Sequence, residues 1–143
     1  MPSKLLCATD GSKPAQKAVA YAVNLAKRNG DALIFLDVVT VSARKAARTY
    51  FWDQEILDAA AVQVHKTLGG AMKAAAAAGL SDATCVTVTG RNISDAITAY
   101  AKKNDVSQII VGSRNRRGAA RLLLGSVAGS VAAKASCPVT IVP

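Results

Sequence analysis

The stretch QIIVGSRNRRGAARLLLGS, residues 108–126, decides how this chain is interpreted, because a short apolar run leads through a glycine-containing loop toward a helical pattern. Gln108–Val111 has the composition of a strand that is buried on both faces, as strands of parallel sheets are. After Gly125-Ser126 the apolar residues recur at helical spacing, at Val127, Val131, Ala132 and Ala135. A strand, a loop and a helix in this order predict one unit of an α/β fold.

The same alternation continues along the rest of the chain. Four further apolar runs predict strands at Lys4–Thr9, Ala32–Val41, Cys85–Thr89 and Val139–Val142. Helical spacing predicts helices from Ala15 to a stop at Asn29-Gly30, over 56–79 and over 93–101. Ser12 is available to cap the first of these helices, and Gly69-Gly70 predicts a weak or bent point in the second.

These elements are expected to form a single domain over residues 1–143. We predict an α/β fold with a doubly wound, five-stranded parallel sheet, helices on both faces and the strand order 3-2-1-4-5. The first and fourth strands are then central neighbours. Ligands of such sheets bind beyond the carboxyl ends of the strands, where the winding reverses. Asp10 and Gly112, which follow or end these two strands, are therefore expected to lie side by side at a binding site.

Composition excludes several kinds of site. The single histidine, His65, cannot form a multi-histidine metal site, and the three cysteines show no CxxC spacing. No apolar run reaches the ~18 residues of a membrane-spanning helix. Cysteines without a disulfide pattern favour a reducing compartment, so we expect a cytoplasmic protein without a membrane partner.

The formal net charge of +9 is concentrated in part near one loop. Arg114, Arg116, Arg117 and Arg121 lie within eight positions, and no acidic residue follows Asp105. These side chains either neutralise a bound phosphate or form a solvated basic loop. Aromatic residues make up only 4% of the chain, so a nucleic-acid partner, which needs stacking platforms for single strands, is poorly supported.

The loop after the fourth strand is suited to a phosphate. Gly112 and Gly118 permit close backbone approach, and the N–H groups at Gly125-Ser126 begin a helix whose dipole favours an anion. The alternative is structural: the first two glycines make a loop, and Gly125-Ser126 caps the helix. Neither GxGxxG after the first strand nor GxxxxGK[ST] anywhere is present, which argues against NAD enzymes and P-loop NTPases.

The chain resembles the universal stress protein family, whose ATP-binding members carry Gly-x2-Gly-x9-Gly-Ser/Thr after the fourth strand. The matching residues are Gly112, Asn115, Gly125 and Ser126, so that Asn115 stands in the place of the second glycine. The stretch ATDGS, residues 8–12, is similar to the turn after the family's first strand, and Cys137-Pro138-Val139 is similar to the entry into its last strand. Ala128 stands where ATP-binding members often have Ser or Thr.

The resemblance implies a nucleotide site that surrounds adenine, ribose and phosphates. Its implied residues are Ala8, Asp10, Val38, Gly112, Arg114, Asn115, Gly125, Ser126 and Val127. Asp10 would accept ribose hydroxyls or share a divalent cation, because a carboxylate otherwise repels phosphate. The implied ligand is ATP or AMP, with Mg²⁺ or Mn²⁺ carried by the nucleotide and no metal site of the protein's own.

The resulting hypothesis is an adenine-nucleotide-binding module of the stress response. The family resemblance implies a homodimer that pairs through the edge strand Val139–Val142. We expect no enzyme, with slow ATP hydrolysis at most, because the phosphate loops contain no His or Glu to activate water. The alternative is a nucleotide-free scaffold of the same fold that binds an acidic protein partner, and nonspecific nucleic-acid binding ranks below both.

Overall fold

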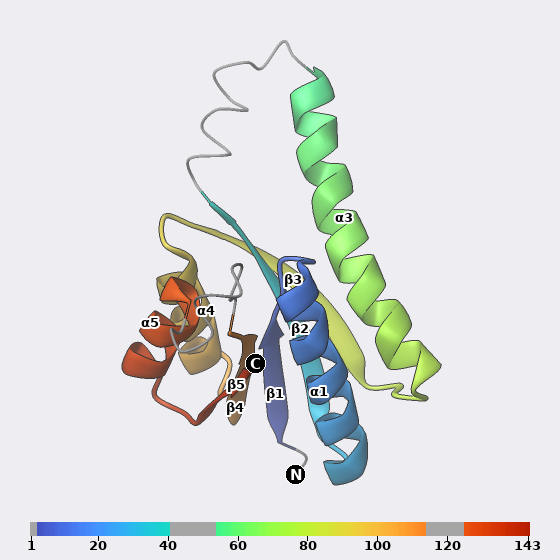
Figure 1. Ribbon diagram of the computed structural model, residues 1–143, viewed down its shortest axis with the longest axis vertical. Helices are drawn as coiled ribbons and strands as arrows, with labels where there is room; N and C mark the ends of the chain where they lie inside the picture. Colours follow the sequence, from blue (N-terminus) through green and yellow to red (C-terminus); the bar gives the residue numbers. More distant parts are fainter. Residues whose placement is uncertain (1–2, 41–53, 114–124) are drawn as a thin grey trace.

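Strands and helices alternate along the chain in the computed structural model, which describes residues 3–40, 54–113 and 125–143. The elements are β1 (Lys4–Ala8), α1 (Lys13–Asn29), β2 (Ala32–Thr40), α3 (Gln54–Ala77), β3 (Ala83–Gly90), α4 (Ile93–Lys103), β4 (Gln108–Gly112), α5 (Ser126–Lys134) and β5 (Val139–Val142). Figure 1 shows the helices packed around a central twisted sheet. Each strand in the described part of the chain thus falls where an apolar run predicted one.

The sheet has five parallel strands in the order β3-β2-β1-β4-β5, which confirms the predicted fold class and topology. β1 and β4 are direct neighbours, with Leu6 opposite Ile109 and Cys7 opposite Ile110. The chain winds outward from β1 to β3 on one side and from β4 to β5 on the other. The point where the winding reverses therefore lies between β1 and β4, as expected.

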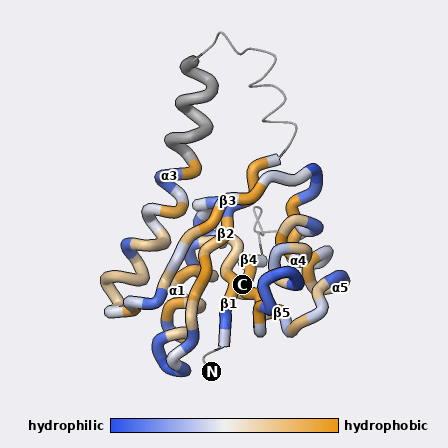
Figure 2. Tube along the Cα trace, turned by 180° about the vertical axis from the view of Figure 1, so that it is seen from behind, coloured by the Kyte–Doolittle hydropathy of each residue, from blue (hydrophilic) through white to orange (hydrophobic). Residues whose placement is uncertain are grey.

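Each face of the sheet packs against a pair of helices. α1 and α3 cover one face, and α4 and α5 cover the other, as Figure 1 shows. Neighbouring residues of β2 alternate between the two layers, because Phe35 packs in the α1/α3 core and Leu36 in the α4/α5 core. Figure 2 accordingly shows the central strands as mainly hydrophobic, with a hydrophilic start of β1. Burial on both faces explains why these strands read as unbroken apolar runs.

The first helix is fixed at both ends by its caps. Ser12 is the N-cap, and its hydroxyl oxygen accepts a hydrogen bond from the Ala15 N–H at 3.4 Å. Gly30 ends the helix in the left-handed conformation, at φ 71°, and its N–H donates to the Ala26 carbonyl. α1 begins at Lys13, two residues before the position that apolar spacing indicated, because the polar first turn carries no apolar signal.

The second predicted helix is a single element, α3, that passes through Gly69 and Gly70 without interruption. Its buried residues on either side of the glycine pair, Leu68, Ala71 and Ala75, belong to the core shared with α1. Tertiary packing of this face outweighs the low helix propensity of two glycines. The other element boundaries coincide with the predicted ones or differ from them by at most two residues.

The three cysteines are free thiols at separate places. Cys7 is buried in β1, and burial raises the pKa of its thiol to about 12, so this sulfur is a packing group and not a nucleophile. Cys85 is exposed on β3 and Cys137 is half-buried. Separately, none of the helices that the structure describes has the length and apolar composition needed to cross a membrane.

Two glycines with open space around them offer a matched test of helix energetics. No heavy atom lies within 4 Å of a Cβ built on Gly70, which is exposed within α3, or on Gly30, the left-handed C-cap of α1. Gly70→Ala is expected to raise the free energy of unfolding by about 0.5–1 kcal/mol, since alanine is the better helix former. Gly30→Ala is expected to lower it by about 1 kcal/mol, because the left-handed conformation crowds a Cβ.

Urea unfolding of both variants and of the unchanged protein measures these differences. A loss of stability in Gly70→Ala would contradict the continuous helix through this position.

Candidate functional site

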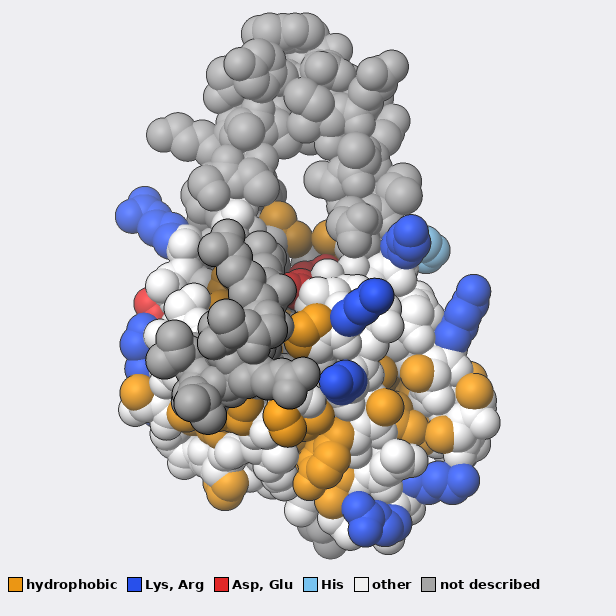
Figure 3. Space-filling view, in the orientation of Figure 1, with side chains coloured by type: hydrophobic (Ala, Val, Ile, Leu, Met, Phe, Trp, Pro, Cys, Tyr) orange, Lys and Arg blue, Asp and Glu red, His pale blue; other side chains and the backbone are white. Residues whose placement is uncertain are grey.

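A cavity of about 90 Å³ opens at the carboxyl edge of the sheet, where β1, β2 and β4 end. Its described lining is Ala8, Thr9, Asp10, Ser12, Pro14, Ala15, Leu36, Asp37, Val38, Ile93, Ile97, Val111, Gly112 and Val127. On this measure the space accommodates several water molecules. Figure 3 shows acidic side-chain atoms set in a hollow among apolar ones. The cavity lies at the reversal point that the topology predicted as a binding site.

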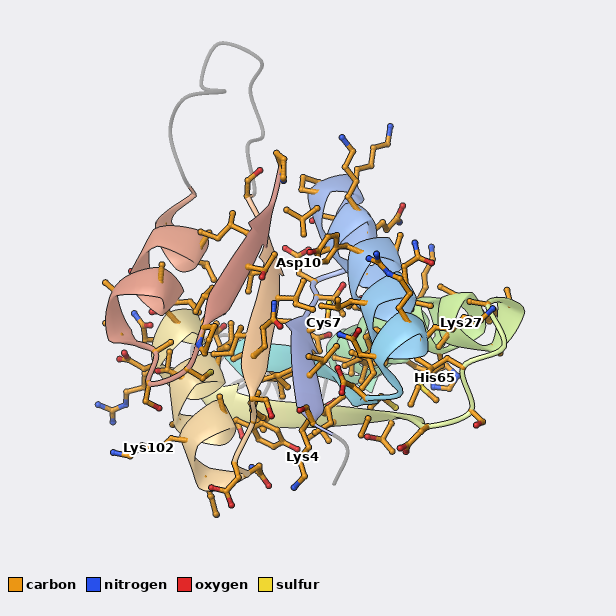
Figure 4. The ribbon with its side chains drawn as sticks, turned by 90° about the horizontal axis from the view of Figure 1, so that it is seen from below. Lys4, Cys7, Asp10, Lys27, His65 and Lys102 are labelled. Atoms are coloured by element: carbon orange, nitrogen blue, oxygen red, sulfur yellow. The ribbon has the colours of Figure 1, made fainter. Side chains whose placement is uncertain are left out.

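The turn after β1 is held by its own short polar side chains. A carboxylate oxygen of Asp10 accepts a hydrogen bond from the Ser12 N–H at 2.9 Å, and the Thr9 hydroxyl oxygen accepts one from the Gly11 N–H at 3.3 Å. Gly11 has φ 79°, and a Cβ there would lie 2.8 Å from the Thr67 hydroxyl of α3. The positive φ and the short distance to Thr67 both favour glycine at this position. The turn places Asp10 beside the start of α1, as Figure 4 shows.

Gly112 ends β4 against the first turn of α1. A Cβ at this position would lie 2.8 Å from the Pro14 carbonyl oxygen and 3.0 Å from its carbonyl carbon. The absent side chain therefore allows two backbones to meet at the edge of the cavity. This contact accounts for the glycine through packing inside the protein, which is a role that the phosphate interpretation of the motif did not include.

The start of α5 faces the cavity from the opposite side. Gly125 is its N-cap and provides no side-chain hydrogen bond, while the Gly125 N–H donates to the Ser113 carbonyl at 2.9 Å. The first intrahelical bond among the described residues runs from the Gly129 N–H to the Gly125 carbonyl. The N–H groups of the first turn, at Ser126 and Val127, are thus not capped by a side chain of residue 125. Val127 itself lines the cavity.

Asp37 is the site residue that sequence reasoning missed. It lies in β2, is half-buried, and lines the cavity together with Asp10. Burial, and after it the negative charge of Asp10, raise the pKa of its carboxyl group to about 6, while a hydrogen bond from the Val38 backbone acts in the opposite direction. The available signal was a lone acidic residue inside the apolar run ALIFLDVVT, residues 32–40.

The structure brings some of the predicted site residues together. Ala8, Asp10, Val38, Gly112 and Val127 all line the cavity. Gly125 and Ser126 lie directly before Val127, at the start of α5. Arg114, Asn115 and the rest of the arginine cluster lie outside the described residues, and their contacts with a ligand stay a prediction.

Other charged and metal-binding side chains lie elsewhere. Lys134 pairs with Asp95 at 2.6 Å, and both side chains are exposed. His65 is exposed on α3 and is not part of the cavity lining; Figure 4 shows it apart from Asp10. Among the described residues no group of three or more His, Cys, Asp or Glu side chains is placed to hold a metal ion. The described cavity lining contains two carboxylates, those of Asp10 and Asp37, and no other Asp, Glu, His or Cys side chain.

The arrangement separates hydrogen-bond acceptors from donors. The two carboxylates come from the turn after β1 and from within β2, whereas the positive end of the α5 dipole lies at Ser126, next to the lining residue Val127. Apolar side chains from β1, β2, β4 and α4 lie between them. Such a site is complementary to a molecule with an anionic end, an apolar or aromatic body and hydroxyl groups.

The chain is similar to known proteins along its whole length. A model of the universal stress protein family matches residues 1–143. Universal stress protein YxiE of Bacillus subtilis (strain 168) is 33% identical over 149 residues, which cover 99% of each chain. The structure of universal stress protein UspA from Lactobacillus plantarum has a TM-score of 0.82 at 26% identity, over 99% of this chain and 97% of that one. A universal stress protein solved in complex with cAMP has a TM-score of 0.74 at 25% identity, over the same shares.

The Asp37 carboxyl group should make stability depend on pH. It keeps its proton up to about pH 6 in the native state, whereas the ordinary value is 3.8. The native protein therefore binds more protons than the unfolded chain between these values, so the contribution of Asp37 to the free energy of unfolding falls as pH rises through this window. Asp37→Asn is expected to stabilise the protein by about 1 kcal/mol at pH 7.5, a value reduced for solvent screening, and to have little effect near pH 4.

Urea unfolding at the two pH values measures this difference. The control is Asp82→Asn, which makes the same change at an exposed residue before β3 and should alter stability by less than about 0.5 kcal/mol at both. An equal effect of Asp37→Asn at both pH values would contradict the prediction.

Proposed function

The chain belongs to the universal stress protein family, and from this premise we propose that it binds an adenine nucleotide in the cavity at the carboxyl edge of its sheet. In this proposal the protein is a binding module of the stress response and not an enzyme. The ligand is ATP or AMP, and its binding changes the surface formed around the start of α5. The compartment is the cytoplasm, where free thiols such as its three cysteines persist.

One observation carries the proposal: the same cavity is lined by two carboxylates and by the first turn of α5, whose N-cap, Gly125, has no side chain to cap the helix. A nucleotide matches both sides, because its phosphate accepts hydrogen bonds from helix N–H groups and its ribose hydroxyls donate to carboxylates. The apolar side chains of Val38, Ile93 and Val127 provide a surface on which a purine can lie. The relative solved with cAMP, at 25% identity, supports the same ligand class.

The described cavity lining offers little chemistry for catalysis. Its titratable side chains are Asp10 and Asp37, and it contains no His, Lys, Arg or Cys. A divalent cation such as Mg²⁺ or Mn²⁺ would be carried by the phosphates, with Asp10 as a possible oxygen ligand that the family resemblance implies. Such a site supports slow hydrolysis at most, since the cavity lining that the structure describes places no strong general base beside the helix start.

A second candidate function is a nucleotide-free scaffold for an acidic protein partner. The groove between α1 and α3 favours it, because α3 contributes His65, Lys66 and Lys73 to the described lining and no acidic residue is present there. A folded protein that binds no nucleotide but binds a polyglutamate peptide at low salt would support this function in place of the first.

We also propose a homodimer that pairs through β5. The Ile109 N–H donates to the Pro138 carbonyl and the Ser113 N–H to the Val142 carbonyl, so the backbone groups of Val139 and Ile141 point to the open edge. An unpaired edge of this kind is a ready template for another strand. Sedimentation at micromolar concentration should give twice the 14.7 kDa chain mass, and a monomer mass at this concentration would contradict the dimer.

Nucleotide binding is tested at the first residue of α5. Ser126 is exposed, and Ser126→Asp places a carboxylate where the helix dipole favours it, so stability should stay equal or rise slightly. The same charge repels phosphate, and the affinity for ATP and AMP should fall by at least about tenfold, or ~1.4 kcal/mol. Calorimetric titration with and without Mg²⁺ measures both ligands.

The matched control is Ser130→Asp, which adds the same charge one turn farther along α5. It should leave the affinity within about threefold of the unchanged protein, because the charge lies farther from the helix start. Equal affinities of the two variants would place the phosphate elsewhere, and no binding by the unchanged protein at millimolar nucleotide would overturn the proposed function.

A further inference from the structure

Asp37 is placed where a strand built only for packing would carry an apolar side chain. The residues before and after it in β2, Leu36 and Val38, both belong to the α4/α5 core, and Phe35 belongs to the α1/α3 core. Leu36 is opposite Ala8, the last residue of β1, so Asp37 lies one position beyond the end of β1. β1 has ended there, whereas β3 still pairs with β2 at Asp37, opposite Thr87, and Asp37 lines the cavity.

This placement brings two carboxylates to one wall of the cavity. Asp10 and Asp37 interact electrostatically and both line the space, whose described lining has no cationic side chain. The other residues around them are mostly apolar, including Leu36, Val38 and Val111. Two like charges in such surroundings are unfavourable until hydrogen-bond donors or a cation compensate them. A ligand that donates hydrogen bonds to these carboxylates therefore gains more binding free energy than a ligand without such donors.

Sugar hydroxyls are the donors that suit this position. In the dinucleotide-binding members of the doubly wound folds, an acidic residue that follows the glycine-rich first turn accepts hydrogen bonds from ribose hydroxyls. This chain lacks that glycine motif, and the parallel is limited to a carboxylate near the carboxyl edge of the sheet. Here Asp37 is in the second strand, and the start of α5, which suits the phosphate, lies at the other side of the same cavity. A cation held by the protein alone is less suited, since the described residues offer no third carboxylate, His or Cys ligand.

We propose that Asp37 is a specificity-determining residue of this site, which selects ligands that present a sugar hydroxyl over their deoxygenated analogues. The inference rests on the proposed nucleotide function. It adds that the protein recognises the sugar of the ligand and that Asp37 makes this contact. Its physical basis is the penalty of the mismatched complex. A deoxy ligand excludes water from the carboxylate and returns no hydrogen bond, and this loss exceeds the modest gain of a matched bond.

The experiment is calorimetric titration of the full chain with AMP, 2′-deoxy-AMP and 3′-deoxy-AMP. The unchanged protein should bind AMP at least about tenfold more tightly than one of the deoxy analogues. In Asp37→Ala and Asp37→Asn this ratio should fall to within about threefold, with the deoxy analogue binding as well as before or better. Thermal unfolding confirms that each variant is folded, and Asp82→Asn, an exposed carboxylate away from the cavity, should keep the full ratio.

Each other outcome overturns the proposal. If both Asp37 variants keep the preference for AMP over its deoxy analogue, other groups provide the discrimination. If the unchanged protein binds all three ligands with equal affinity, it recognises no sugar hydroxyl, although it still binds nucleotide. A rise in melting temperature with Mg²⁺ alone that disappears in Asp37→Asn would assign the carboxylate pair to a cation. No binding of any of the three nucleotides overturns the proposed function, and this inference with it.

Discussion

The backbone contact between the end of β4 and the first turn of α1 is the constraint on which the site depends. Pro14 and Gly112 approach so closely that no Cβ fits between them. This contact fixes where α1 begins relative to the neighbouring strands β1 and β4, and both residues line the cavity. Because close-packed interiors do not deform smoothly, a side chain at residue 112 would displace the wall of the cavity together with the helix.

The two sides of the cavity have opposite electrostatic character for different reasons. The start of α5 gains its positive potential from the backbone, which every helix provides. The carboxylate side instead needs particular residues, and Asp37 keeps its charge at an energetic cost because burial and Asp10 both disfavour the ionised form. The helix dipole is thus supplied by the fold, while the carboxylate side depends on particular side chains, Asp10 and Asp37.

Much of the fold follows from local patterns in the sequence. Unbroken apolar runs located the strands, and Ser12 and Gly30 were recognisable as the two caps of α1. The site was less predictable, because its position follows from strand order while its lining comes from tertiary contacts. The role of Gly112 illustrates this, since its neighbour Pro14 is almost one hundred positions away. Asp37 was overlooked because a single polar residue does not change the period of a strand, and only the end of β1 beside it reveals that it faces a cavity.

The free-energy cost of ionising the half-buried Asp37 carboxyl group also bears on the choice between a nucleotide-binding function and a nucleotide-free scaffold. A scaffold that docks partners through the groove between α1 and α3 has no need of a half-buried carboxylate on the neighbouring strand layer, and an apolar or amide side chain would serve its stability better. In the proposed ligand-binding function the carboxylate has a use, because hydrogen-bond donors of the ligand would compensate a charge that is destabilised in the empty protein. Ligand binding then adds to the stability of the native state according to RT ln(1 + [L]/Kd). In the proposed function, the residue that weakens the empty fold is therefore the one through which an occupied site would stabilise the whole domain.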